Sequence, residues 1–187
     1  MLVFLDFEAS SLGKNSYPVE VAWVFEDGTS RAHLIRPTPD WTDWSVKAER
    51  IHGLSRRRLH QEGTPAAEVA RDMLDALEGH AFYASAPSWD GKWLSVLLRA
   101  GGLPRHALRL GKSDDVFLAH ARTIMDGTFT RREIADFVKS MIESTEPAQP
   151  VHRALGDATL EHARWLAIRK AAAQAVTERR NAPTVPL

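Results

Sequence analysis

The sequence predicts a three-layer α/β domain built on a mixed sheet. Its 187 residues suit one compact domain and are too few for two separate cores. Two apolar runs of strand type flank Asp27-Gly28, a dipeptide that strongly favours a hairpin. Farther along the chain, apolar strand candidates alternate with amphipathic helices, which is the pattern of a sheet covered by helices.

Strands are expected where short apolar runs are bounded by turn residues. The first run is apolar without alternation, which is typical of a strand buried on both faces. The expected strands are 1–8, 19–26, 29–36, 81–85 and 108–110.

Helices are expected where apolar residues recur every three or four positions. Thr64-Pro65 begins a helix that ends at Gly79, and Asp90 begins one that ends at Gly101-Gly102. Pro147 and Pro150 then break the chain before the last helix. The other expected helices are 43–51, 114–125, 130–143 and 154–176, so residues 1–176 form one domain and 177–187 a loose tail.

Composition narrows the function classes. The absence of cysteine excludes disulfides, thiolate metal sites and cysteine nucleophiles, and favours a reducing, cytoplasmic location. The start MLVFLDFE lacks a basic leader, and no apolar run is long enough to span a bilayer.

Charge is balanced, with 24 basic and 24 acidic residues. This disfavours a protein that coats long nucleic acid, but not an enzyme that holds a few nucleotides. A local basic cluster lies in ERIHGLSRRRLH, for which a solvated helix end is the alternative. The cluster comprises Arg50, His52, Arg56, Arg57 and Arg58.

Asp6 and Glu8 lie two residues apart at the end of the first expected strand, so both side chains point to one face. Two carboxylates buried together repel each other and lose hydration, and a divalent cation removes both costs. The alternative is structural: Asp6 caps a turn while Glu8 lies in the loop and faces solvent. Ligands of such sheets bind at the carboxyl ends of the strands, which places a candidate site here.

Asp90, His152 and Asp157 are further candidates, each with an ordinary alternative. Asp90 follows the 81–85 strand, where its carboxylate would point toward Asp6, but aspartate is also a favoured N-cap. His152 precedes the last helix and Asp157 lies in its first turns, so both approach one centre from that helix end. An aspartate there is also favoured by the helix dipole alone.

In this order, three motifs resemble the DEDDh group of 3′–5′ exonucleases, a DnaQ-like family of the ribonuclease H-like superfamily. They are DFEASSLG, SAPSWDGKWL and HRALGDA. The segments IHGLS and GTPAAEVARDML are also similar to stretches of that group, and the likeness covers residues 1 to about 170. It implies a three-layer ribonuclease H-like fold with a mixed, mostly parallel five-stranded sheet flanked by helices.

The resemblance implies two-metal hydrolysis of terminal phosphodiester bonds at the 3′ ends of single-stranded DNA or RNA. Asp6, Glu8 and Asp157 would hold the ion that carries the attacking water, with Asp6 bridging to a second ion and Asp90 completing the set. His152 would be the general base, since histidine titrates near the working pH. Mg²⁺ or Mn²⁺ suits these oxygen-rich ligands.

Substrate contacts follow from the same resemblance. Main-chain groups near Ala9 and Ser10 would meet the terminal nucleotide, Leu12 would wedge against its base, and His52 would lie beside it. For Leu12, core packing is the alternative. The second motif departs from the family at Ala86, where asparagine is common, which leaves substrate preference open.

Two other functions stay open on sequence grounds. A non-catalytic nucleic-acid- or protein-binding module on this fold would be expected to lack a ligand and to have a more basic surface. A phosphohydrolase of small nucleotides would use the same residues in a closed pocket. The sequence is compatible with a homodimer or a polymerase partner.

Overall fold

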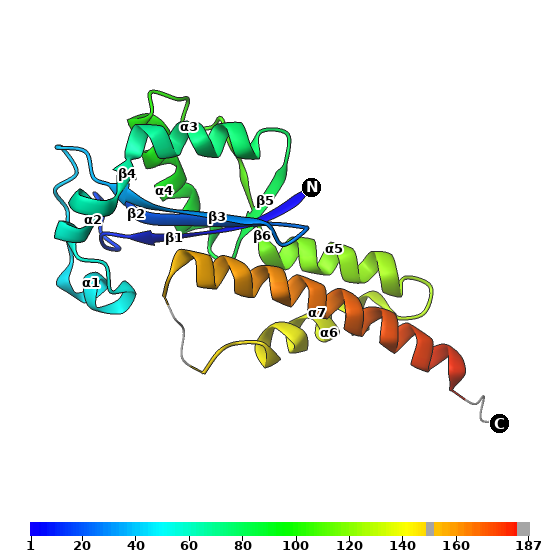
Figure 1. The fold of residues 1–187 in the computed structure, drawn as a ribbon. Coiled ribbons are helices and arrows are strands. Elements are labelled where there is room, and N and C mark those ends of the chain that lie inside the picture. The colour runs from blue at the N-terminus through cyan, green and yellow to red at the C-terminus, as the bar shows by residue number, and fades with distance from the viewer. Residues whose placement is uncertain (149–151, 183–187) are drawn as a thin grey trace. The chain divides into compact units, whose positions relative to one another are not determined.

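Six strands form one mixed sheet in the computed structural model, which describes residues 1–148 and 152–182 (Figure 1). The sheet order is β4-β3-β2-β1-β5-β6. The second strand is antiparallel to both its neighbours and the remaining pairs are parallel. The expected mixed, mostly parallel sheet is confirmed, with six strands instead of five. They are β1 (Leu2–Ala9), β2 (Pro18–Phe25), β3 (Ser30–Arg36), β4 (Thr64–Pro65), β5 (Ala81–Ala84) and β6 (Leu110–Lys112).

Seven helices lie in the described residues: α1 (Val46–His52), α2 (Arg56–Glu62), α3 (Ala66–Leu77), α4 (Pro87–Ala100), α5 (Ser113–Met125), α6 (Arg131–Ser144) and α7 (Ala154–Asn181). The helix α2 was not expected. The helix α7 continues to Asn181 instead of ending near 176, so the tail expected at 177–187 begins inside it. Pro150 and residues 183–187 lie outside the described residues.

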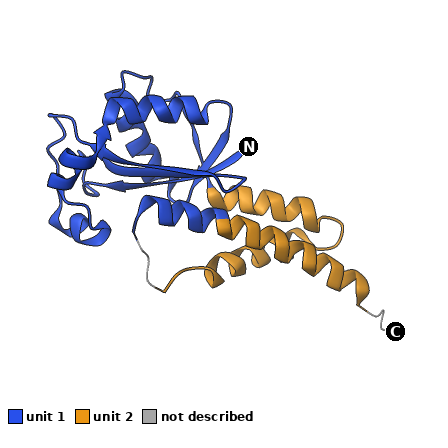
Figure 2. Ribbon diagram, in the orientation of Figure 1, with its two compact units in different colours: residues 1–112, 150–162 blue, residues 113–149, 163–187 orange. Residues whose placement is uncertain are grey.

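The chain divides into two compact units, residues 1–112 with 150–162 and residues 113–149 with 163–187 (Figure 2). In the second unit, the indole N–H of Trp165 donates to His120 Nδ1 at 3.0 Å. The Arg164 guanidinium pairs with Glu146 at 2.8 Å. All five candidate metal and base residues belong to the first unit. Among the described helices, none combines the length and apolarity needed to cross a bilayer.

The two faces of β1 are covered by different helices. Val3, Leu5 and Phe7 belong to the core cluster that α3 and α4 complete. Phe4 instead meets the His162 ring of α7, with 6.1 Å between ring centroids. Helices therefore cover both faces, as expected for three layers. Because side chains alternate along a strand, Asp6 and Glu8 share the α7 face with Phe4.

The hairpin predicted at Asp27-Gly28 is confirmed between β2 and β3. Gly28 adopts a left-handed φ of 87°, a conformation that costs glycine little. The Asp27 carboxylate accepts a hydrogen bond from the Thr29 main chain at 2.9 Å. This local turn fixes the register of β2 against β3, in which Glu20 pairs with Leu34. On the other side of β2, Glu20 lies opposite Glu8 of β1.

Candidate active site

Asp6 and Glu8 lie at the carboxyl end of β1, inside the strand and partly buried. Burial, followed by the charges of Asp90 and Asp157, raises the pKa of Asp6 well above its ordinary value. Burial, then the Asp157 charge, raises the pKa of Glu8 to about 8. The structural alternative, a turn cap and a solvent-facing loop, does not fit these positions. The strand holds two acids whose charge is costly without a counter-cation.

Asp90 is not the N-cap of its helix, because α4 begins at Pro87 and its N-cap is Ala86, which makes no side-chain capping bond. Asp90 lies in the first turn and is 2% exposed. Burial raises its pKa to about 7, although hydrogen bonding to the main chain of Phe7 and Ala86 opposes the rise. Its Oδ2 is buried without a hydrogen-bond partner among the described residues. The capping alternative therefore fails, and an acceptor oxygen is left for a cation.

His152 and Asp157 approach Glu8 from the N-terminal end of α7. One ligand atom from each of these three residues lies within 4.8 Å of the others. Asp157 occupies the first turn of α7, and His152 lies two residues before the helix begins at Ala154. His152 is exposed and has a φ of 50°, a left-handed conformation that is uncommon for residues other than glycine. The backbone is thus held in an unfavourable conformation where the imidazole joins the acids.

An ion pair between the buried Glu20 and the partly exposed Arg153 holds the chain next to His152 in place. Glu20, 3% exposed on β2, accepts two hydrogen bonds from Arg153 Nε and one from Arg153 Nη2, the last at 2.6 Å. Its Oε2 also accepts the main-chain N–H of Ala154 at 2.9 Å. Glu20 faces Glu8 across the strand pair, yet its carboxylate is occupied by the start of α7. Sequence reasoning missed this residue, whose signal is an acid within the apolar run PVEVAWVF.

A cavity of about 290 Å³ lies beside Glu8 and His152. Three of the residues expected to meet substrate, Ala9, Leu12 and His52, line it. Leu12 is 70% exposed, so its alternative as a core residue is wrong. Sequence reasoning missed four further lining residues. Three of them are apolar and line the cavity together with Leu12. These are Ser11, Ala48, Ile51 and Trp93.

His52 enters this cavity wall as a neutral donor. The Leu54 N–H donates to its Nδ1 at 3.0 Å, which leaves the ring proton on Nε2. Burial lowers the pKa of His52, which also favours the neutral ring. The Nε2 is near the Ala9 main chain but makes no well-formed hydrogen bond among the described residues.

Ser10, in contrast, belongs to the framework and not to the cavity. Its N–H donates to Tyr17 O and its carbonyl accepts from Ser45 N–H, both at 2.9 Å. Its hydroxyl donates to Asp43 at 3.2 Å and accepts from the Tyr17 N–H at 3.1 Å. Both main-chain polar groups of Ser10 are therefore already paired within the fold, and its contact with substrate stays a prediction.

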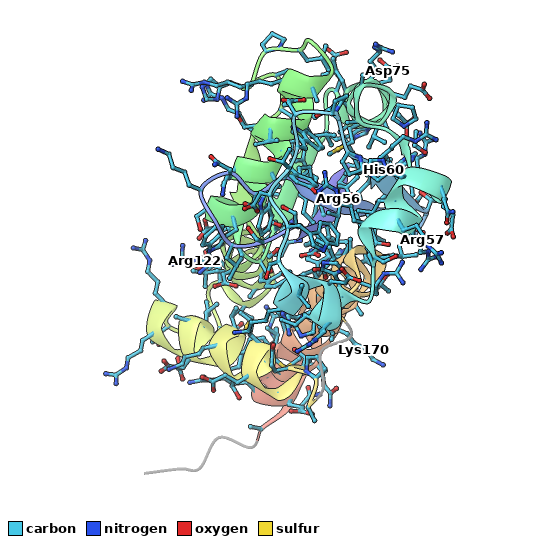
Figure 3. All side chains as sticks on the ribbon, turned by 90° about the vertical axis from the view of Figure 1, so that its left-hand side faces the viewer. Arg56, Arg57, His60, Asp75, Arg122 and Lys170 are labelled. Atoms are coloured by element: carbon cyan, nitrogen blue, oxygen red, sulfur yellow. The ribbon has the colours of Figure 1, made fainter. Side chains whose placement is uncertain are left out.

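Two arginines of the basic cluster expected around residues 50–58 are engaged in local contacts. Arg56 donates to the Trp41 carbonyl at 3.0 Å, and Arg58 pairs with Glu62 one helical turn away at 2.8 Å. Figure 3 shows Arg56 toward the middle of the molecule's face and Arg57 at its outer edge. Arg56 and Arg58 thus serve local contacts within the fold.

The donor set fits a hard divalent cation. Four carboxylates and one imidazole gather here, no thiolate exists in the chain, and Asp90 keeps a buried oxygen without a partner among the described residues. Oxygen-rich sites of this kind suit Mg²⁺ and Mn²⁺. A cation would also relieve the burial and repulsion that raise the pKa values of Asp6, Glu8 and Asp90.

No protein-family model and no curated protein matches this sequence. Solved structures do match in fold. The chain resembles a zinc-bound complex of E. coli exonuclease I with single-stranded DNA, with a TM-score of 0.65 and 13% identity over 95% of this chain and 42% of that one. An exonuclease I from Methylocaldum szegediense gives a TM-score of 0.62 and 15% identity over 91% of this chain and 41% of that one.

The chain thus spans less than half the length of these exonuclease I chains. At such low identity the likeness establishes the fold and nothing finer. The fold is the ribonuclease H-like arrangement of a mixed sheet flanked by helices, as the sequence motifs implied.

Proposed function

We propose that this chain is a metal-dependent 3′–5′ exonuclease of single-stranded nucleic acid. The observation that carries the proposal is the meeting of Glu8, His152 and Asp157 within 4.8 Å. Close to them, the buried Oδ2 of Asp90 has no hydrogen-bond partner in the part of the chain that the structure describes. An adjoining cavity with an exposed leucine gives a place for one nucleotide. The exonuclease I fold supports the same class of reaction.

In this proposal Asp6, Glu8, Asp90 and Asp157 would hold two Mg²⁺ or Mn²⁺ ions. When bound, such ions make water acidic enough to attack at neutral pH and neutralise charge on the leaving oxygen. His152 takes a proton from the attacking water. Its exposure lets it pass that proton to solvent.

The cavity residues orient the terminal nucleotide. Leu12 and Ile51 offer apolar contacts to the base or sugar, and the Nε2–H of His52 is a donor suited to a sugar hydroxyl or carbonyl oxygen. Apolar contacts do not distinguish bases strongly, so degradation should be largely independent of sequence.

The test is digestion of a 5′-labelled single-stranded oligonucleotide with Mg²⁺, Mn²⁺ or EDTA. A ladder shortening from the 3′ end, abolished by EDTA and by Asp6→Ala, is the expected result. Asp75→Asn, an exposed acid on α3 (Figure 3), serves as the matched control and should stay active. Matched DNA, RNA and duplex arms give the substrate preference.

Two outcomes would reject the proposal. One is equal activity in wild type, Asp6→Ala and His152→Ala, which would assign the cleavage to a contaminant. The other is hydrolysis of free nucleotides without shortening of the oligonucleotide, which would make the chain a small-nucleotide phosphohydrolase.

A further inference from the structure

A basic groove of about 560 Å³ runs along α4. Four residues of α4 and five of the segment 105–110 line it, and no carboxylate is among them. Its basic side chains are Arg105, His106 and Arg109, all exposed. In a chain with equal numbers of acids and bases, this is a local surplus of positive charge.

The guanidinium groups supply that charge. Arg105 Nε donates to His106 Nε2 at 2.8 Å, so the imidazole acts as an acceptor and is neutral on that nitrogen. Neither Arg105 nor Arg109 has an ion pair with a carboxylate among the described residues. Arginine binds phosphate oxygens through paired N–H groups, and a phosphodiester is the anion that this groove fits.

Lining residues of the groove and of the terminal cavity lie on either side of Asp90 around the α4 helix. With about 100° between successive helix residues, Trp93 of the cavity lies about 60° to one side of Asp90, and Pro87 and Leu94 of the groove lie about 40–60° to the other. The Asp90 carboxylate therefore points between the two hollows. A strand whose last nucleotide lay in the cavity would have to pass Asp90 to reach the groove.

Gly91 keeps the groove side of this turn bare. A Cβ at this position would meet nothing within 4 Å, so no packing contact requires glycine there. Glycine inside a helix is unfavourable by about 1 kcal/mol relative to alanine. The residue next to Asp90 thus leaves the helix backbone open toward the groove.

Resting on the proposed function, we propose that Arg105 and Arg109 bind the phosphates of the single strand immediately upstream of the scissile bond. The terminal nucleotide occupies the cavity, the scissile phosphate lies at the carboxylates, and the preceding phosphates follow the groove. The groove gives the enzyme affinity for a strand over a mononucleotide. It reads no sequence, because phosphate contacts position a nucleic acid without distinguishing its bases.

Two substrates separate the groove from the catalytic centre. Thymidine 5′-(p-nitrophenyl phosphate) carries a scissile phosphodiester but no upstream phosphate, whereas a single-stranded 15-mer has both. The variant is Arg105→Ala/Arg109→Ala, and the control is Arg71→Ala/Arg180→Ala, which removes the same charge from exposed sites on α3 and α7.

The groove variant should lower kcat/KM for the 15-mer about tenfold at low salt, mainly through KM. It should leave hydrolysis of the ester unchanged. The slope of log affinity against log salt should fall by about 1.4, because each phosphate contact in a single strand contributes about 0.7. Unchanged 15-mer kinetics, or an equal loss in the control, would overturn the groove assignment.

A binding measurement keeps this inference separate from the proposed activity. Fluorescence anisotropy of the labelled 15-mer in EDTA reports affinity without catalysis. If the wild type hydrolyses neither substrate, the nuclease proposal fails, and weaker binding by the groove variant alone still supports the groove. Equal binding by both variants and the wild type would reject it.

Discussion

Replacing Asp90 by asparagine should stabilise the metal-free protein at alkaline pH. Asp90 is 2% exposed, and burial raises its pKa from 3.8 to about 7. The folded protein therefore holds this proton to higher pH than the unfolded chain does. By linkage, the protonated Asp90 carboxyl group contributes stability to the folded protein. This contribution is complete below pH 3.8 and is lost as pH rises through about 7.

The magnitude follows from that pKa change. Each unit of pKa difference between the folded and unfolded states corresponds to about 1.4 kcal/mol. At pH 8 the ionised Asp90 carboxylate therefore destabilises the folded state by up to about 4 kcal/mol. At pH 5 the same calculation gives a destabilisation of the folded state by about 2 kcal/mol. Asparagine has nearly the same shape and no charge to desolvate. The stability advantage of Asp90→Asn in EDTA should therefore roughly double between these pH values.

The assay is urea unfolding of both proteins in EDTA at pH 5 and pH 8, repeated with Mn²⁺. Mn²⁺ should stabilise the wild type at pH 8 more than Asp90→Asn, because the variant lacks one ligand oxygen. Asp75→Asn, which changes an exposed acid, should show no such pH dependence. An Asp90→Asn protein less stable than wild type at pH 8 in EDTA would refute the reasoning.

Three other changes test the site. His152→Ala should lower kcat on a single strand by about a hundredfold or more while Mn²⁺ affinity, measured by calorimetry, is retained; parallel loss of both would make His152 a ligand instead. Glu20→Gln should destabilise the fold by about 1–3 kcal/mol and lower kcat more than KM. Arg153→Lys should retain part of the wild-type kcat. A normal kcat in Glu20→Gln would show that Glu20 has no positioning role. Leu12→Ala should raise KM about tenfold, with a free energy of unfolding within about 0.5 kcal/mol of wild type; a clear drop in stability would return Leu12 to the core.

Much of the fold was readable because its signals are local. The strand period alone placed Asp6 and Glu8 on one face, and Asp27-Gly28 fixed the hairpin. The helix α2 was missed because RRRLHQE has one apolar residue, Leu59, and no repeat. Its start depends on Ser55, whose hydroxyl accepts the Arg58 N–H at 3.2 Å. The two-residue strand β4 is too short for any periodic signal.

The start of α4 shows how two valid signals compete. Aspartate is a good N-cap and proline a good first helical residue. The aspartate was the predicted start of the helix, whereas the helix begins three residues earlier at Pro87. That shift moves Asp90 from a solvated cap into a buried first turn. The same residue thereby changes from an ordinary structural acid into one that lacks a counter-charge.

The role of Glu20 could not be read from spacing, because it depends on a partner 133 residues away. On its face of the sheet it looks like a further metal ligand beside Glu8. In the structure its carboxylate oxygens instead accept hydrogen bonds from Arg153 and from the Ala154 N–H. Long-range pairing of this kind is decided by which segments meet in the fold, and only the structure supplies that information.

The four carboxylates of the site repel an anionic substrate, and the zero net charge of the whole chain does not remove this local repulsion. A phosphodiester approaching Asp6, Glu8, Asp90 and Asp157 is repelled by all of them unless cations intervene. Bound metal would answer this at the scissile phosphate, but its field is screened within about 10 Å at 0.1 M salt. Upstream phosphates therefore need cations of the protein's own, and Arg105 and Arg109 lie on the other side of Asp90 from the terminal cavity. If the metal centre alone supplied the attraction, salt dependence would be the same for mononucleotide ester and 15-mer; a steeper dependence for the 15-mer requires the groove.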